Sequence, residues 1–278
     1  MIHEKIKVMT VVSINSPNWT NEEIRNSFTE FTKLYMSRPI KNNTGGMRAP
    51  HAFASFFMLK KLQPKTIIES GVWKGQGTWL FEQACPEAKI ICLDINFKNL
   101  IYKSKNAKYI EKDFSLVNLD HIEKNTSLCF FDDHQNALTR MQQMKWKGFS
   151  KAIFEDNYPA KRGDCYSIKK IFANAGFILE QPSKFILKKF LKKTLQSIAR
   201  CSNTSSIEPN KTHSLELKKN LKLYYEFPPL FKEYLTRWGD KWDEDNYPTK
   251  SELFDSSVAH PLRSEALSYS WMCLVELV

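Results

Sequence analysis

The sequence lacks three features that would assign it directly to a class of protein. It has six cysteines in 278 residues, and no two of them stand at C-x-x-C spacing. Cys92, Cys129 and Cys273 lie in apolar runs, which is typical of reduced, buried thiols. No apolar run reaches the roughly 18 residues of a membrane span, and the N-terminal run "VMTVVSI" lacks a signal-peptide pattern. We therefore expect a soluble, cytoplasmic protein that folds without disulfides.

Acidic residues are missing from one long stretch, "KFILKKFLKKTLQSIAR" at 184–200, which supplies much of the net charge of +11. A basic chain attracts phosphates, but the remainder is closer to balance, so a nucleic-acid partner is not favoured. Three interpretations of this basic helix stay open. It packs its apolar side on the domain, it binds an anionic or nucleotide-linked acceptor, or it makes peripheral contact with an anionic membrane.

Between residues 65 and 177, short apolar runs alternate with helix-like stretches. Five runs are predicted strands: "TIIES", "KIICLDI", "AKYIEKD", "SLCFFDD" and "KAIFED". This alternation predicts an α/β fold, with a doubly wound, Rossmann-like, mostly parallel sheet and helices on both faces. Each run ends in carboxylates, and the carboxyl ends of parallel strands form the edge where open α/β sheets bind ligands.

The flanking segments predict additions to this core. Residues 20–38 read as a helix with a capping box at "TNEE", and "AFASFFMLKKL" reads as a second helix. We therefore predict a helical extension over residues 1–60 and one main domain over 61–278. Within that domain, residues 184–260 are expected to form a cap, and residues 269–278 a final strand that returns to the sheet edge.

A glycine-bearing turn follows the first predicted strand in "TIIESGVWKGQGTWL". The pattern is G-x-x-x-G-x-G and not the G-x-G-x-x-G of dinucleotide sites, and Glu69 directly precedes the turn. A carboxylate there would repel a pyrophosphate but would suit a cationic ligand. S-adenosylmethionine (SAM) is such a ligand, and Asp94 at the end of the second strand could accept hydrogen bonds from its ribose. SAM is therefore favoured over NAD.

At this point the sequence resembles the class I SAM-dependent methyltransferases. From Gly45 to Phe177 it is most similar to their cephalosporin-hydroxylase-like and macrocin O-methyltransferase-like group, with the segment "GGMRAPHAFASFFMLKKLQPKTIIESGVWKGQGT" leading into the SAM loop. The resemblance implies an O-methyltransferase. It also implies a set of cofactor-binding residues: Glu69, Gly71, Gly75, Thr78, Asp94 and Asp113.

The same group often places a divalent metal beside the methyl donor, and "CFFDDHQ" and "AIFEDNYP" occupy the matching places. The resemblance maps metal ligation onto these two segments, at Asp132, Asp133, Glu155, Asp156 and Asn157, with the register open. Carboxylate and amide oxygens suit Mg²⁺ or Mn²⁺. His134 is a candidate general base or an orienting donor, and Asp133 is its expected catalytic companion.

The stretch "EDNYPAK" at 155–161 returns as "EDNYPTK" at 244–250, but only the first copy follows a predicted strand. The second is expected to be a surface turn, unless Trp238 and Trp242 fold over the cleft.

The prediction is SAM-dependent methylation of a hydroxyl on a small molecule or sugar, by a protein that could form homo-oligomers. The alternatives are a metal-independent methyltransferase, or a non-catalytic binding protein that uses residues 184–200.

Overall fold

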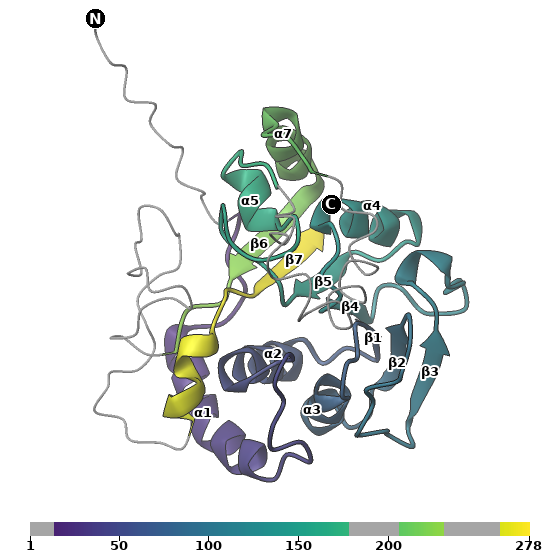
Figure 1. Cartoon of the computed structure of the whole chain (residues 1–278), viewed down its shortest axis with the longest axis vertical. Helices are drawn as coiled ribbons and strands as arrows, with labels where there is room; N and C mark the ends of the chain where they lie inside the picture. The colour runs from purple at the N-terminus through teal and green to yellow at the C-terminus, as the bar shows by residue number, and fades with distance from the viewer. Residues whose placement is uncertain (1–13, 178–205, 231–261) are drawn as a thin grey trace, which may run out of the picture.

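A seven-stranded sheet forms the centre of the protein in the computed structural model, which describes residues 14–177, 206–230 and 262–278 (Figure 1). Its strand order is β3-β2-β1-β4-β5-β7-β6. The bounds are β1 Thr66–Ser70, β2 Lys89–Asp94, β3 Ala107–Glu111, β4 Ser127–Phe131, β5 Lys151–Phe154, β6 Leu221–Glu226 and β7 Cys273–Leu277. β1 to β5 are parallel, whereas β7 is antiparallel to both of its neighbours. The predicted doubly wound α/β fold is confirmed.

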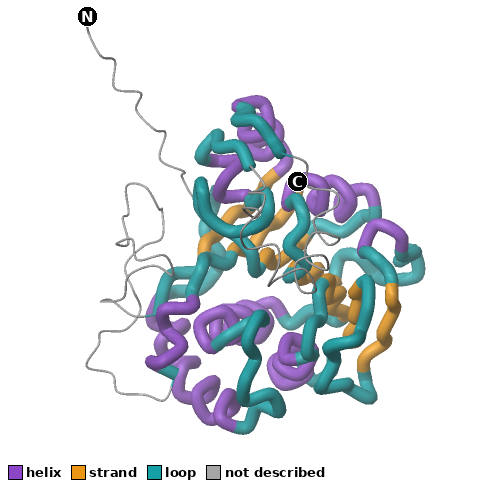
Figure 2. The backbone as a smooth tube through the Cα atoms, in the orientation of Figure 1, coloured by secondary structure: helices purple, strands orange, loops and turns teal. Residues whose placement is uncertain are grey.

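Helices cover both faces of this sheet. On one face lie α1 (Asn21–Met36), α2 (Ala49–Leu62), α3 (Gln76–Ala84) and the 3₁₀ helix η2 (Arg263–Ser268). On the other lie α4 (Ala137–Trp146), α5 (Ile168–Phe172) and α7 (Lys211–Asn220). The short 3₁₀ helix η1 (Phe114–Leu116) follows β3. Figure 2 shows the strands between the two groups of helices.

The central strands β1 and β4 are fully buried because each of them contributes to two cores. Successive side chains of a strand point to opposite faces, and so Ile67 packs in the core under α1, α2 and α3 while Ile68 packs in the core under α4, α5 and α7. All five residues of β1 and of β4 are buried. Burial of whole strands is what a parallel sheet with two covered faces produces.

The two predicted N-terminal helices are present and pack against the sheet. α1 begins at the predicted capping box, in which the Thr20 side chain accepts from the backbone of Glu23 and the Glu23 side chain accepts from the backbone of Thr20. α2 starts three residues earlier than expected, with Pro50 in its first turn, a position that proline tolerates. The boundary at residue 60 stays a prediction, since α1 and α2 share one core with β1 and α3.

The C-terminal strand is present, but its expected place at the sheet edge is wrong. β7 lies between β5 and β6, and β6 is the edge strand on that side of the sheet, as β3 is on the other. The sequence interpretation did not identify β6, whose residues "LKLYYE" alternate between buried and more exposed positions after α7. β6 therefore lacks the run of fully buried residues that marks a central strand such as β4.

Three predictions fall on residues outside the described ranges. They are the basic helix at 184–200, the second "EDNYPTK" copy at 244–250, and the contribution of Trp238 and Trp242 to a cap. Of the predicted cap at 184–260, only residues 206–230 are described, and these form α7, β6 and the loops beside them. In the described part of the chain, no helix combines the length and the apolar character that crossing a membrane demands.

Candidate active site

Two glycines shape the turn between β1 and α3. Gly71 has φ +93° and Gly75 has φ +90°, which is the left-handed region that glycine adopts without steric cost. Neither position has room for a side chain. A Cβ on Gly71 would lie 1.9 Å from the backbone oxygen of Asp132, and one on Gly75 would lie 2.2 Å from the backbone oxygen of Tyr102. The turn is therefore packed tightly against the loop that follows β2 and the loop that follows β4.

Asp94 ends β2 beside this turn and holds it in place. Its Oδ2 accepts a hydrogen bond from the backbone N–H of Val72 at 3.0 Å and a longer one from Trp73 at 3.4 Å. Its Oδ1 accepts from the backbone N–H of Asn96. The carboxylate thus lies at the strand edge as expected, and it already orders the backbone on which a cofactor would rest.

Glu69 faces α3 and not the cavity beside the turn. Its Oε2 accepts a hydrogen bond from the Thr78 hydroxyl at 2.6 Å, and the Cys92 thiol lies 3.3 Å away. Burial raises the pKa of the Glu69 carboxyl to about 8, although the hydrogen bonds from Thr78 and Cys92 oppose this. The structure therefore brings Glu69 and Thr78 together beneath the start of α3, where they support the glycine turn.

Arg140 on α4 connects two of the predicted site residues. The guanidinium lies 2.6 Å from Asp113 Oδ2 and 2.9 Å from Asp133 Oδ2, and the Ser70 hydroxyl donates to the same Asp133 oxygen. Burial favours the neutral form of Asp113, but the contact with Arg140 holds its pKa below the ordinary value. Asp133 is therefore engaged by Arg140 and Ser70, and it is not part of the cluster of possible metal ligands described below.

A cavity of about 200 Å³ opens at the carboxyl ends of β1, β2 and β4. Its lining contains both predicted cofactor residues and predicted metal residues, among them Gly71, Asp94, Asp113 and Asp132. Several lining side chains were not singled out in the sequence: Trp73, Ile95, Lys112, Gln135 and Arg140. They belong to the turns that follow the strands or to the first turns of a helix, and their spacing carries no recognisable motif.

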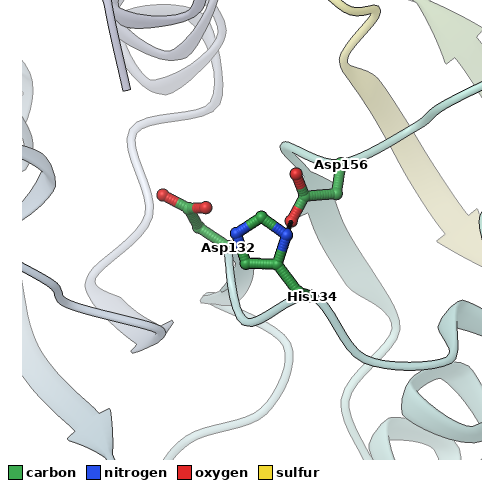
Figure 3. Close-up of side chains that lie close together, drawn as sticks. All are labelled: Asp132, His134 and Asp156. Carbon is green, nitrogen blue, oxygen red and sulfur yellow. Dashed lines mark ion pairs between the residues drawn. The ribbon is translucent and has the colours of Figure 1, made fainter. Parts of the chain in front are cut away.

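Three potential metal ligands meet at the edge of this cavity. Asp132 and His134 follow β4, Asp156 follows β5, and one ligand atom from each lies within 4.8 Å of the others. Figure 3 shows the His134 ring between the two carboxylates. His134 Nδ1 lies 3.4 Å from Asp156 Oδ2 and 3.0 Å from Asp164 Oδ1. The two strand ends are therefore brought together as the sequence predicted.

The carboxylates of this cluster and of its neighbours shift the pKa values of Asp132 and His134. Burial, together with Glu155 and Asp156, holds the pKa of Asp132 well above its usual range. Burial disfavours the charged imidazole, yet Asp156 and Asp164 raise the pKa of His134 well above its ordinary value. Both carboxylate oxygens of Asp156 are buried without a hydrogen-bond partner. Such an arrangement of carboxylates is stabilised by a cation.

The neighbours of Asp156 point in other directions. Glu155 contacts His51 Nδ1 at the start of α2, and the His51 Nε2 accepts from the backbone N–H of Ser270. Asn157 donates to the Tyr224 hydroxyl at 3.0 Å, and its Oδ1 accepts from a backbone N–H of α5. The structure therefore does not bring Glu155 or Asn157 into the cluster of Asp132, His134 and Asp156.

Comparison with known proteins gives similarity at the level of solved structures. No protein-family model matches the chain, and no curated protein matches it in sequence. The chain is similar to a putative O-methyltransferase from Klebsiella pneumoniae, at 11% identity and a TM-score of 0.43, over 95% of this chain and 91% of that one. It is similar to the methyltransferase PaMTH1 of Podospora anserina bound to S-adenosylhomocysteine (SAH), at 11% identity and a TM-score of 0.41, over 95% and 99%. A CmcI structure with magnesium and SAM gives 13% identity and a TM-score of 0.39, over 97% and 89%.

Proposed function

We propose that this chain is a SAM-dependent O-methyltransferase, which methylates a hydroxyl of a small molecule or sugar with the help of a divalent metal. One observation carries the proposal. A single cavity joins the glycine turn and Asp94, which suit SAM, to Asp132 and His134 at the edge of the possible metal site. A methyl donor and a metal-bound acceptor would therefore lie next to each other.

The residues of the turn fit SAM. Gly71 lines the cavity together with Asp94, and the Asp94 carboxylate is the candidate acceptor for ribose hydroxyls. Gly75 is packed against the backbone of Tyr102 and supports the turn. When bound, SAM supplies an electrophilic methyl group on a sulfonium. The chain's contribution is to fix the donor by its backbone, so that donor and acceptor meet in a reactive geometry.

The residues of the cluster fit a divalent cation. The oxygens of Asp156, which accept no hydrogen bond, and the nearby Asp132 carboxylate offer the hard oxygen donors that such an ion requires. A bound metal supplies Lewis-acid activation, which lowers the pKa of a coordinated hydroxyl. His134 lies between acids that favour its protonated form, and a protonated imidazole cannot accept a proton. We therefore do not place His134 as the general base, and in this form its ring pairs with Asp156 and Asp164.

The acceptor class comes from the sequence resemblance, which points to sugars and natural products. An anionic or nucleotide-linked acceptor remains part of this proposal, because it would suit a chain with a net charge of +11. Small hydroxylated molecules, including sugars and nucleotide-linked sugars, are the first group of acceptors to test for methyl transfer.

Isothermal titration of SAH into the purified chain tests the first half of the proposal. We expect SAH to bind the wild-type chain and to lose affinity in Asp94→Asn, since the amide offers the ribose and the turn a weaker acceptor. Asp120→Asn is the matched control, because Asp120 is exposed and lies outside the cavity. Absence of SAH binding in all three proteins would overturn the methyltransferase proposal.

Titration of divalent metal into the EDTA-treated chain tests the second half. We expect a heat of metal binding that disappears in Asp156→Asn, with SAH affinity largely retained. SAH binding without any metal binding would favour the alternative of a metal-independent methyltransferase. SAH binding with no turnover on any hydroxyl acceptor would favour the alternative of a non-catalytic binding protein.

A further inference from the structure

A short turn between α1 and α2 contributes to the wall of the cavity. Residues 43–47, called the N-terminal turn below, place Gly45 among the lining residues. Within the turn, the Gly46 N–H donates to the Asn43 carbonyl at 3.1 Å, and Asn43 Nδ2 donates to the Met47 carbonyl at 2.9 Å. Asn43 and Met47 are buried, whereas Gly45 is exposed. The N-terminal turn is therefore a compact unit with a buried base and an exposed tip at the cavity.

Trp73, in the turn between β1 and α3, lies against this tip and also lines the cavity. Its indole N–H donates to the Thr44 carbonyl at 3.3 Å. Two glycines let the ring approach, because a Cβ on Gly46 would lie 2.9 Å from Trp73 Cδ1 and one on Gly45 would lie 3.5 Å from Trp73 Cζ2. Trp73 has φ +49°, an unusual value for a bulky residue. Such a conformation persists where the surroundings hold it, as at ligand-binding sites and switches.

The contacts between the two turns lie near the surface. Lys74 Nζ adds a second hydrogen bond, to the Asn42 carbonyl at 3.1 Å, and both this bond and that of Trp73 are exposed. Segments held by exposed hydrogen bonds open at a lower free energy than packed cores. By contrast, α2 is buried from Ala49 to Leu59. The tip can therefore separate from Trp73 while the helix that follows it stays packed.

We propose, resting on the SAM part of the proposed function, that the N-terminal turn is a lid on the cofactor cavity and that Trp73 is its latch. Each methyl transfer leaves SAH in the cavity, and SAH must leave before the next SAM binds, a step that lids often control. The latch joins two parts of the chain and uses no ligand atom, so it restrains the lid in the free chain as well as in the complex. Opening therefore precedes both entry and exit, and a weaker latch should speed both.

Surface plasmon resonance on the immobilised full-length chain tests this, with SAH as the probe. It gives the association and dissociation rate constants without relying on tryptophan fluorescence, which the variants alter. Trp73→Phe keeps an aromatic ring and removes the N–H donor. Gly46→Ala weakens the same contact from the lid side, at a position without a left-handed φ that does not line the cavity. Trp146→Phe is the matched control, because Trp146 is 82% exposed and lies outside the cavity.

We expect Trp146→Phe to behave as wild type. In Trp73→Phe both rate constants should rise roughly 2–10-fold, which corresponds to the net contribution of one hydrogen bond. Gly46→Ala should change both rate constants in the same direction. The Kd for SAH should change less than either rate constant, because the two increases offset each other. Circular dichroism checks that each variant is folded.

Two results would overturn the lid. Faster dissociation with unchanged association would show that Trp73 contacts the cofactor and does not control its access. Unchanged rate constants in both variants would show that the N-terminal turn does not limit exchange. If Trp73→Phe failed to fold, the same comparison on Gly46→Ala would decide. Failure of the methyltransferase proposal itself is distinguishable, because wild type and Trp146→Phe would then not bind SAH at all.

Discussion

Glu69 carries a buried carboxyl whose ionisation should affect folding. Its pKa is about 8 in the folded chain, against an ordinary value of 4.5, so the folded state retains a proton that the unfolded chain loses. The free energy of unfolding should therefore fall as pH rises from about 4.5 to about 8, by about 1.4 kcal/mol for each pH unit at most. Above pH 8 both states are ionised and this contribution is constant.

Substitution of Glu69 by glutamine tests this link. Glu69→Gln should remove that part of the pH dependence and should be relatively more stable than wild type at pH 8, as measured by urea denaturation between pH 5 and pH 9. Glu87→Gln alters an exposed acid in the turn that follows α3 and serves as control. Equal slopes for wild type and Glu69→Gln would show that Glu69 is not protonated in the folded chain.

Gly71 gives a second prediction at the scale of one residue. In Gly71→Ala the new methyl group would lie 1.9 Å from the backbone oxygen of Asp132. The turn must then move, and we expect SAH binding to be lost in isothermal titration. Gly148→Ala is a close control, because Gly148 has φ +81° but its Cβ would meet nothing nearer than 3.5 Å. The control should lose about 1–2 kcal/mol of stability from the left-handed backbone alone and should keep its SAH affinity. Normal SAH binding by Gly71→Ala would exclude the turn as the cofactor site.

At the scale of elements, a buried ion pair ties α5 to the edge strand β6. Lys169 Nζ lies 2.6 Å from Glu226 Oε2, with side chains 5% and 3% exposed, and burial lowers the pKa of Lys169. Glu226→Gln leaves a buried cation without its counter-charge and should cost roughly 3–5 kcal/mol of unfolding free energy. The measurement is chemical denaturation at neutral pH.

The control for this pair lies on the next strand. Lys222 and Glu276 join β6 to β7 at 2.9 Å, with side chains 63% and 26% exposed. Glu276→Gln should cost no more than about 1 kcal/mol, because water screens an exposed pair. If Glu226→Gln cost as little as Glu276→Gln, the Lys169 side chain would have access to water or to another partner.

The sequence predicted the helices and strands better than it predicted the contacts of each acidic residue at the strand ends. β1 to β5 were recognisable because short apolar runs alternate with helix-like stretches, and α1 was recognisable from its capping box. The register of the acids was not, because adjacent side chains at a strand end point in different directions. Asp132 faces the cluster and Asp133 faces Arg140, while Glu155, one position before Asp156, faces α2. Only the tertiary contacts separate these roles.

At the scale of the whole molecule, the two cores share one sheet. On β7, Leu274 packs in the core under α1, α2 and α3, and Val275 packs in the core under α4, α5 and α7. Leu274→Ala should cost about 2–5 kcal/mol, and Val275→Ala less, because fewer carbons are removed. Both should shift one common transition when unfolding is followed by far-ultraviolet circular dichroism and by tryptophan fluorescence. Two separated transitions would instead indicate an independent N-terminal unit, as a boundary at residue 60 implies.

The position of β7 inside the sheet also affects the order in which the sheet forms during folding. Phe154 on β5 pairs with Cys273 on β7, and the two residues are 119 positions apart in the sequence (273 − 154). By contrast, β1 to β5 all lie within residues 66–154. Closing such a long loop is slow compared with pairing strands that are near in sequence. Contacts beside Asp156, such as that between His51 and Ser270, wait for this closure. A refolding chain should therefore regain most of its parallel sheet before the contacts beside Asp156 are complete.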